Sequence, residues 1–297
     1  MCTAILWKHY FGRTLDYELS FGEKVVLVPR RMPLEFRVKP PLKSHYAILG
    51  MASVQQGVPL FFDGMNERGL AMAGLQFAEY ADYSKGGTLA PFELIPWVLG
   101  QCADLAQARR LLRGQELCDI SFAKDLPNAP LHWMIADGSG ALILEPTAEG
   151  LRMYDATEGV LTNSPPYPYH KLRYEELQHL SAEPAPHSAR RGLQAVGLPG
   201  DYSSASRFIR AAFIRAHLRG EGEGAFYSMT DNISVPRGCI RLPQGDAFTR
   251  YTCCCDLKGG IYSYTTHQTR APIAFSFAER DLDGDQIFCC KLEKTMI

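Results

Sequence analysis

The sequence predicts an α+β fold in which helices flank antiparallel sheets. Short apolar and β-branched segments come first, a helical pattern follows, and strands, helices and strands then return in turn. The strict alternation of strand and helix that indicates a parallel sheet is not seen. The chain has 297 residues, 46% of them hydrophobic. This is enough for a large core, and we expect a single domain over residues 1–297.

The first third of the chain is predicted to form strands. Each segment is short, rich in apolar or β-branched residues and bounded by Gly, Pro or charged residues. The predicted strands are Cys2–Trp7, Tyr10–Leu15, Lys24–Pro29, Tyr46–Val54 and Leu70–Gln76.

The periodicity changes between Pro91 and Leu112. Apolar residues recur there at helical spacing and predict two helices joined near residues 100–104. After them, the segment Asp137-Gly138-Ser139-Gly140 marks a hairpin turn, and Ser203 or Ser204 can cap a helix.

The remaining elements follow from the same rules. The predicted strands are His132–Ala136, Ala141–Glu145, Leu151–Asp155, Val160–Thr162, Arg250–Asp256, Ile261–Thr266 and Ala271–Phe277. The predicted helices are His170–Leu180 and Ser203–Arg219. Residues 181–200 between these helices are rich in Pro, Ala and Gly and are expected to form a surface loop.

Charge and composition exclude several functional classes. Lys and Arg number 31 against 32 Asp and Glu, without a dense basic stripe, so nucleic acid is not an expected partner. No apolar run approaches the roughly 18 residues of a membrane helix, so we expect no membrane partner. The first residues lack the pattern of a secretory signal, and we expect a cytoplasmic protein.

The cysteines indicate neither disulfides nor a metal site. Nine is an odd number, and no CxxC pair has a matching partner, so reduced thiols are expected and structural zinc is not. The segment Asp281-Leu282-Asp283-Gly284-Asp285 has its glycine misplaced for a calcium loop and is interpreted as a turn. We expect no metal ion and no organic cofactor.

The chemistry suggested by the sequence begins at its second residue. Removal of Met1 would give Cys2 both a thiol and a free α-amine, which titrate near ~8.5 and ~7.7–8.0 in general. A nucleophile would then carry its own base, as in N-terminal threonine catalysis. Cys2 alone is also consistent with an ordinary buried or oxidisable cysteine.

Arg13 and Asp16 are candidate partners of this residue. If the first two strands pair as a hairpin, both approach the start of the chain. Arg13 would then favour the thiolate through its charge, and Asp16 would hold the α-ammonium. A surface ion pair is the alternative interpretation of the two residues.

A set of motifs resembles the choloylglycine hydrolase family, which contains conjugated bile salt hydrolases and penicillin V acylases. The motifs occur in the order of that family from residue 1 to about residue 275. They are Met1-Cys2-Thr3, Phe11-Gly12-Arg13-Thr14-Leu15-Asp16, Asp63-Gly64-Met65-Asn66-Glu67, Gly74-Leu75-Gln76-Phe77, the segments 131–137, 159–165 and 197–201, Ser206-Arg207-Phe208 and Lys258-Gly259-Gly260-Ile261-Tyr262.

The resemblance implies an N-terminal nucleophile hydrolase with a four-layer αββα sandwich, often a homotetramer. It implies hydrolysis of the amide bond of glycine- or taurine-conjugated bile salts through a thioester on Cys2, with Met1 removed. Two alternatives remain open. One is an acylase of penicillin V or of other N-acyl amides such as acyl-homoserine lactones, and the other is a non-catalytic binding protein of the same fold.

The resemblance also implies individual roles. Cys2 matches the nucleophile, Arg13 and Asp16 match the pair that contacts it, and Arg207 matches the arginine that completes the charged network. Asn163 matches the residue whose side-chain amide helps to form the oxyanion hole, and such an amide is a suitable neutral donor.

Gln76 is a departure from the family pattern. It matches the position that donates its backbone N–H to the oxyanion, where related bile salt hydrolases usually carry asparagine and penicillin V acylases tyrosine. The longer amide can change how the scissile amide is seated. By the same alignment, the apolar acyl pocket is lined by Leu15, Phe62, Phe122, Leu126 and Leu131, each of which core packing also explains.

Overall fold

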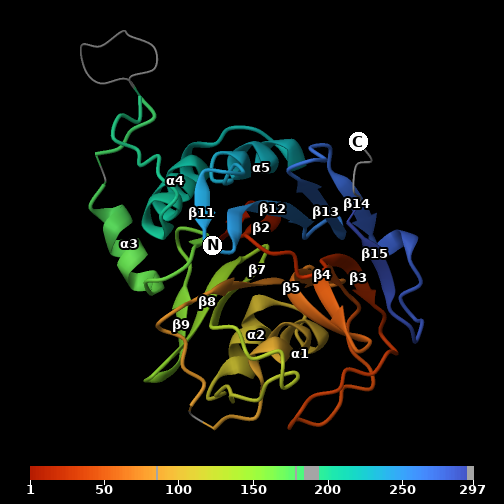
Figure 1. Ribbon diagram of the computed structural model, residues 1–297. Coiled ribbons are helices and arrows are strands. Elements are labelled where there is room, and N and C mark those ends of the chain that lie inside the picture. Colours follow the sequence, from red (N-terminus) through yellow and green to blue (C-terminus); the bar gives the residue numbers. More distant parts are fainter. Residues whose placement is uncertain (85, 178, 184–193, 293–297) are drawn as a thin grey trace.

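Two antiparallel sheets lie face to face, with helices on both outer faces (Figure 1). The computed structural model describes residues 1–84, 86–177, 179–183 and 194–292. One apolar cluster fills the space between the sheets and the space under the upper helices, and a second lies between the lower sheet and its helices. The predicted α+β class and the four-layer αββα sandwich are confirmed.

The upper sheet carries the start of the chain. Its strand order is β10-β1-β2-β12-β13-β14, with β11 paired to β12. The bounds are β1 Cys2–Trp7, β2 Tyr10–Tyr17, β10 Val160–Leu161, β11 Ile240–Leu242, β12 Gly245–Asp256, β13 Ile261–Thr266 and β14 Ile273–Ser276.

The lower sheet has the order β15-β3-β4-β5-β6-β7-β8-β9. Its strands are β3 Lys24–Val28, β4 Ile48–Gln55, β5 Val58–Asn66, β6 Ala71–Gln76, β7 Leu131–Asp137, β8 Gly140–Thr147, β9 Gly150–Asp155 and β15 Phe288–Lys291.

Each outer face has its own helices (Figure 1). Below the lower sheet lie α1 (Leu94–Gln101) and α2 (Leu105–Leu112), which contact β5 and β8. Above the upper sheet, α4 (Ser204–His217) and α5 (Gly222–Asp231) contact β1 and β2, and α3 (Tyr167–Glu175) packs on α4. Two short 3-10 helices are η1 (Pro91–Glu93) and η2 (Phe277–Glu279).

The β1–β2 hairpin determines which side chains at the chain start share a face. Cys2 pairs with Leu15 and Ala4 pairs with Arg13. Because paired residues point to one side and neighbours along a strand to opposite sides, these four side chains face the other sheet. Asp16 belongs to the opposite set and faces the helices.

Most predicted elements are present, and the misses have physical causes. The hairpin, the two helices after Pro91 and the Ser203 cap are confirmed, because Ser203 accepts from the Ser206 N–H. The prediction omitted β5, whose Pro59 and Gly64 both disfavour strands.

Three further corrections concern the second half of the chain. The helix predicted over His170–Leu180 is α3 (Tyr167–Glu175), which begins at Tyr167 because Pro168 suits the first turn of a helix, where its missing N–H is not needed. The sequence analysis also missed α5 and the short strands β11 and β15. Part of the predicted loop, residues 184–193, lies outside the described residues.

All nine cysteines lie in the described part of the chain and are free thiols, as predicted. In β12, Cys253 and Cys255 share the face of Arg13, whereas Cys254 points to the helices, as strand alternation requires. No group of metal-ligating side chains occurs among the described residues. Within these same residues, every helix is too short or too polar to cross a bilayer.

Candidate active site

The thiol of Cys2 lies against a buried guanidinium. Nη2 of Arg13 is 2.6 Å from Sγ of Cys2, and both residues are at most 4% exposed. Nη1 of Arg13 donates to the carbonyl oxygens of Gly74 at 2.8 Å and Phe62 at 3.2 Å. Burial lowers the pKa of Arg13, but the neighbouring groups that can carry negative charge, Cys2 and Asp63 among them, outweigh it, and the net shift is upward. The arginine is therefore a permanent cation beside the sulfur.

The lower sheet opens to admit this side chain. The pairing of β5 with β6 extends only from Met65 to Asp63, which pairs with Ala73. A β-bulge follows on the other edge of β5, because Met51 pairs with Asp63 and Ala52 with Phe61, which leaves Phe62 as the extra residue. The carbonyls freed by the opening and the bulge are those that bind Arg13.

Arg207 approaches the same point from α4. Its Nη1 donates to the carbonyl oxygen of Cys2 at 2.5 Å and to Oγ1 of Thr3 at 2.6 Å, and its Nη2 donates to Oδ1 of Asn163 at 2.8 Å. Burial lowers the pKa of Arg207, and the nearby charges of Asp16 and Cys2 oppose that shift. One side chain thus ties together the backbone of Cys2 and the side-chain amide of Asn163.

Asp16 lies on the helix side of the hairpin. Its carboxylate accepts from Oγ1 of Thr14 at 3.1 Å and Oγ1 of Thr249 at 2.6 Å, and it is 4.0 Å from Nη1 of Arg207. Among the described contacts, the backbone N of Cys2 donates to Asn163 rather than to Asp16. Contact between Asp16 and a free α-amine therefore stays a prediction.

Asn163 lies opposite the chain start because β10, which ends two residues earlier, pairs with β1. Its Oδ1 accepts from the N of Cys2 at 2.7 Å, and its Nδ2 donates to the carbonyl oxygen of Gln76 at 2.9 Å. Met1 is in place here, and its amine donates to the carbonyl oxygen of Asp16 at 2.6 Å. Release of Met1 would leave the Cys2 amine beside Asn163.

The backbone N–H of Gln76 points toward the same opening. Phe77 N donates to Pro130 O at 2.7 Å, toward β7. Because N–H groups alternate sides along an antiparallel strand, the N–H of Gln76 points away from β7, to the side where Gly74 meets Arg13. This is the orientation that a backbone oxyanion donor needs.

Behind Asn163 is a buried polar cluster that the sequence analysis did not identify. The carbonyl oxygen of Asn163 accepts from Nε2 of His170 and Oγ of Ser204, both at 2.8 Å. Nε2 of His132 is 2.7 Å from the carbonyl oxygen of Thr162. Burial lowers the pKa of His170 to about 4, so the ring is neutral at pH 7. Only Ser204 carried a sequence signal, as a possible helix cap.

The five predicted pocket residues fall into two groups. Leu15 pairs with Cys2, the carbonyl of Phe62 binds Arg13, and Leu131 pairs with Gln76, so these three adjoin the site. Phe122 and Leu126 belong instead to the irregular segment between α2 and β7, where Leu126 is 39% exposed.

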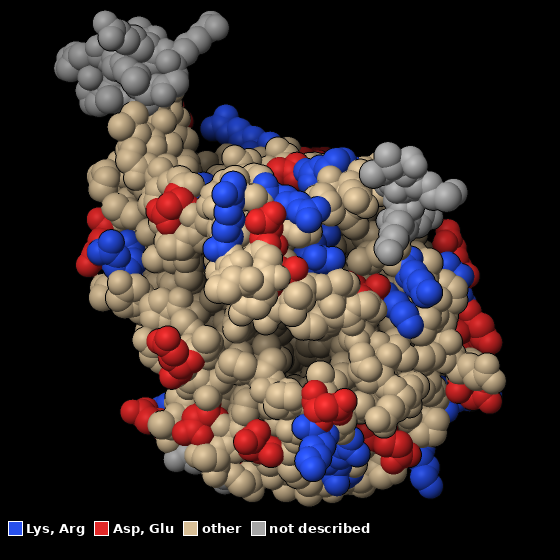
Figure 2. Space-filling model, viewed as in Figure 1, with Lys and Arg blue, Asp and Glu red and all other residues tan. Residues whose placement is uncertain are grey.

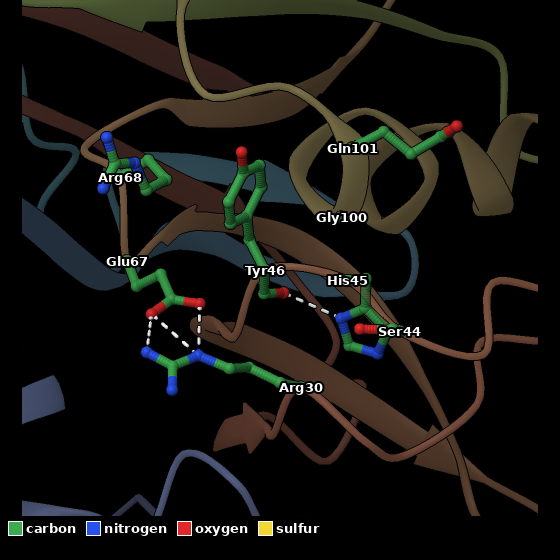
Figure 3. A pocket seen from close by; sticks show the side chains of 8 residues that line it. All are labelled: Arg30, Ser44, His45, Tyr46, Glu67, Arg68, Gly100 and Gln101. Carbon is green, nitrogen blue, oxygen red and sulfur yellow. Dashed lines mark hydrogen bonds and ion pairs between the residues drawn. The ribbon is translucent and has the colours of Figure 1, made fainter.

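Two sizeable cavities are lined by other residues. One, of 630 Å³, opens beside α1, and Figure 3 shows Arg30 paired with Glu67 and His45 bonded to the Tyr46 carbonyl at its wall. There Arg30 donates to the carboxylate of Glu67, and the ring of His45 bonds to two backbone carbonyls. The second, of 870 Å³, lies around the turn between β2 and β3. Neither includes Cys2 in its lining.

Comparison with known proteins agrees with this geometry. Residues 2–290 match the family described as linear amide C–N hydrolases, choloylglycine hydrolase family. The chain is 37% identical to the bile salt hydrolase/transferase of Lactiplantibacillus plantarum, over 97% of this chain and 95% of that protein.

Solved structures show the same architecture. A mutant conjugated bile acid hydrolase from Clostridium perfringens superposes with a TM-score of 0.94 at 32% identity, covering 99% of this chain and 98% of the other. A penicillin V acylase from Agrobacterium tumefaciens gives a TM-score of 0.78 at 22% identity, over 97% of this chain and 90% of its own. The latter likeness is one of fold alone.

Proposed function

The chain belongs to the choloylglycine hydrolase family of linear amide C–N hydrolases, and we propose that it hydrolyses the amide bond between a bile acid and glycine or taurine. The observation that carries the proposal is the buried Cys2–Arg13 pair at a removable N-terminus. The likeness to bile salt hydrolases over nearly the whole chain supports the substrate class.

Cys2, freed of Met1, acts as the nucleophile. Its thiolate attacks the amide carbonyl carbon, forming the C–S bond as the carbonyl oxygen becomes an oxyanion. The N–H of Gln76 and the side-chain amide of Asn163 hold that oxygen. One amide proton of Asn163 is used by the Gln76 carbonyl, and the other is available to the oxyanion.

The α-amine of Cys2 moves the proton. It takes the thiol proton before attack and delivers it to the leaving nitrogen when the C–N bond breaks, so glycine or taurine departs as a neutral amine. Water then adds to the thioester and releases the bile acid. The second proton of the water restores the thiol of Cys2. Oδ1 of Asn163, which is oriented by Nη2 of Arg207, keeps the amine in place, and the negative charge of Asp16 stabilises its ammonium form.

An uncharged hollow supports an apolar acyl group. Figure 2 shows a depression near the centre of the face on which Figure 1 places the N-terminus, lined by residues other than Lys, Arg, Asp and Glu. Leu15, Phe62 and Leu131 next to the site supply apolar surface of the kind a steroid needs. Phe122 and Leu126 are proposed to extend it from their loop.

Cys2→Ser tests the nucleophile, with Cys118→Ser as the matched control at a buried thiol outside the site. We expect Cys2→Ser to lose nearly all turnover of glycocholate and taurocholate with its melting temperature kept, and Cys118→Ser to stay active. Residual activity comparable to wild type in Cys2→Ser contradicts the proposal. Mass spectrometry of active enzyme should show that Met1 is gone.

The same preparation tests the substrate class. Turnover of glycocholate, taurocholate and phenoxymethylpenicillin is compared at equal enzyme concentration. A kcat/KM for the bile salts well above that for the penicillin supports the proposal. The reverse order would reassign the chain to the acylases, with the same nucleophile.

The family resemblance suggests the assembly, and the lack of a secretory-signal pattern in the first residues suggests the location. We propose a homotetramer in the cytoplasm. Light scattering of the purified protein measures the assembly, and fractionation of the producing cells measures the location.

A further inference from the structure

A second carboxylate is buried between the sheets next to Arg13. Asp63 on β5 is 0% exposed. Its Oδ2 accepts from the hydroxyl of Tyr251 at 2.5 Å, and its Oδ1 accepts from the hydroxyl of Tyr262 at 2.7 Å. Nε of Arg13 lies 4.0 Å from Oδ2. The guanidinium therefore has the sulfur of Cys2 at one side and this carboxylate at another.

Opposing effects act on the carboxyl of Asp63. Both oxygens receive a phenol hydroxyl, and a permanent cation is adjacent, which stabilises the ionised form. Burial raises the pKa of Asp63 and outweighs the opposing effects of Arg13, Tyr251 and Tyr262, so the net shift is upward. Burial also raises the pKa of Cys253 well above its ordinary value, so this facing thiol stays neutral.

The remaining titratable neighbours of Asp63, namely Cys255, Tyr251 and Tyr262, do not add charge. Burial raises the pKa of Cys255, and Tyr251 and Tyr262 also have pKa values raised well above the ordinary range by burial. The charged groups between the sheets at this point are thus Arg13, Asp63 and, when it reacts, Cys2.

Packing alone gives no reason for a carboxylate here. Replacing a buried ion pair by well-packed apolar side chains is often neutral or stabilising. Asp63 also sits where the lower sheet opens, one residue after the bulged Phe62 whose carbonyl binds Arg13. Asp63 therefore lies where the pairing of β5 with β6 ends, and its position bears on the orientation of the Arg13 guanidinium.

We propose that Asp63 is a positioning residue for Arg13. Anchored by Tyr251 and Tyr262, its carboxylate lies 4.0 Å from Nε, whose N–H donates to the carbonyl oxygen of Thr14 at 3.3 Å. Its charge attracts the guanidinium from that side, so that Nη2 faces the sulfur of Cys2. Its negative charge also offsets part of the positive charge that the sulfur experiences. The inference rests on the proposed function in one respect, namely that Cys2 is the nucleophile.

Asp63→Asn removes the charge and keeps the shape. The test measures the alkylation rate of Cys2 by iodoacetamide as a function of pH, following the N-terminal peptide by mass spectrometry. Without the counter-charge, Arg13 favours the thiolate more strongly, so the midpoint of the pH profile should move down by on the order of one pH unit. Glu93→Gln, at another buried carboxylate that binds backbone N–H groups, should leave the midpoint unchanged.

Tyr262→Phe provides a second variant if Asp63→Asn does not fold. It keeps the carboxylate but removes one hydroxyl that stabilises its ionised form, so the midpoint should move in the same direction by a smaller amount. An unchanged midpoint in a folded variant of either kind overturns the proposal.

The alkylation assay needs no turnover and separates the two hypotheses. If wild-type Cys2 is unreactive at every pH while the protein is folded, the proposed nucleophile fails. If wild-type Cys2 reacts and Asp63→Asn gives the same profile, only the role of Asp63 fails.

Discussion

The residues around Cys2 and the loop that carries Phe122 are held in different ways. At Cys2, two buried guanidiniums reach across layers to backbone carbonyls, with Arg13 binding Gly74 and Arg207 binding Cys2 itself. The two ends of the irregular segment between α2 and β7 are tied to the rest of the fold, at Leu117 by a bridge to Leu89 and at Ala129 by the hydroxyl of Tyr83. The stretch around Phe122, between these ends, has an exposed guanidinium as its anchor.

That anchor is Arg37. Its Nη2 donates to the carbonyl oxygen of Phe122 at 2.5 Å, and its guanidinium lies 5.3 Å from the Phe122 ring and 5.9 Å from the Phe92 ring. Stacking on two rings is a typical use of arginine. The comparison indicates that the contacts at Cys2 and those of the Phe122 stretch are independent of each other, so a change in one should leave the other intact.

The largest effect is expected at Arg207. Arg207→Lys cannot reproduce three simultaneous bonds, to the carbonyl of Cys2, to Thr3 and to Asn163. Since these orient the nucleophile and the oxyanion amide, kcat should fall about 10²–10³-fold, equivalent to about 2.7–4 kcal/mol, with KM little changed. Steady-state kinetics on glycocholate measures both.

Arg210→Lys is the matched control one turn further along α4. Arg210 is also buried, but its bonds go to the carbonyl oxygens of Pro199, Asp201 and Asn232. It should keep kcat within a few-fold of wild type. Equal losses of kcat in the two variants would show that α4 contributes only packing, and the comparison between the two regions would lose its basis.

Local sequence patterns predicted which residues meet at the chain start better than they predicted how those residues are arranged. The hairpin that joins Cys2 to Arg13 was predictable from two short strands and a tight turn. Arg13 and Asp16 are three apart, so strand alternation alone assigns their side chains to opposite faces of the hairpin. The helix face then explains why Asp16 meets Arg207 and Thr249.

Other features depend on contacts that no local pattern encodes. The bulge at Phe62 arises where β4 and β5 shift register, and the burial of Asp63 needs both sheets in place. The predicted helix began three residues too late, at His170 instead of Tyr167. The bond from His170 to the Asn163 carbonyl could therefore not be predicted. Such residues become interpretable only after layer packing is known.

A pH effect of intermediate size is expected behind Asn163. The pKa of His170 is lowered by burial to about 4, against about 6.5 when exposed. The unfolded chain then binds a proton that the folded one does not, so stability is fully present above pH 6.5 and is lost as the pH falls toward 4. The contribution is at most about 3 kcal/mol. Urea unfolding at pH 7, 5.5 and 4.5 measures it.

His170→Gln should flatten this dependence, because the amide can still donate to the carbonyl but does not titrate. His179→Gln, at an exposed histidine, should retain the wild-type slope. If both variants lose stability on acidification as steeply as wild type, the buried cluster is not the source of the acid sensitivity. The contacts behind Asn163 would then not make the stability of the protein depend on pH.

The smallest effect is expected at the loop. Arg37→Gln removes the bond to the Phe122 carbonyl and both ring contacts, while Cys2 and its partners are untouched. The loop should then order at the moment of binding, so KM for glycocholate should rise about fivefold, near 1 kcal/mol, with kcat within twofold. Arg113→Ala, at an exposed position, should change neither constant. A fall in kcat at constant KM in Arg37→Gln would contradict a role of this loop that is confined to substrate binding, because such a role changes KM and leaves turnover at saturation unaltered.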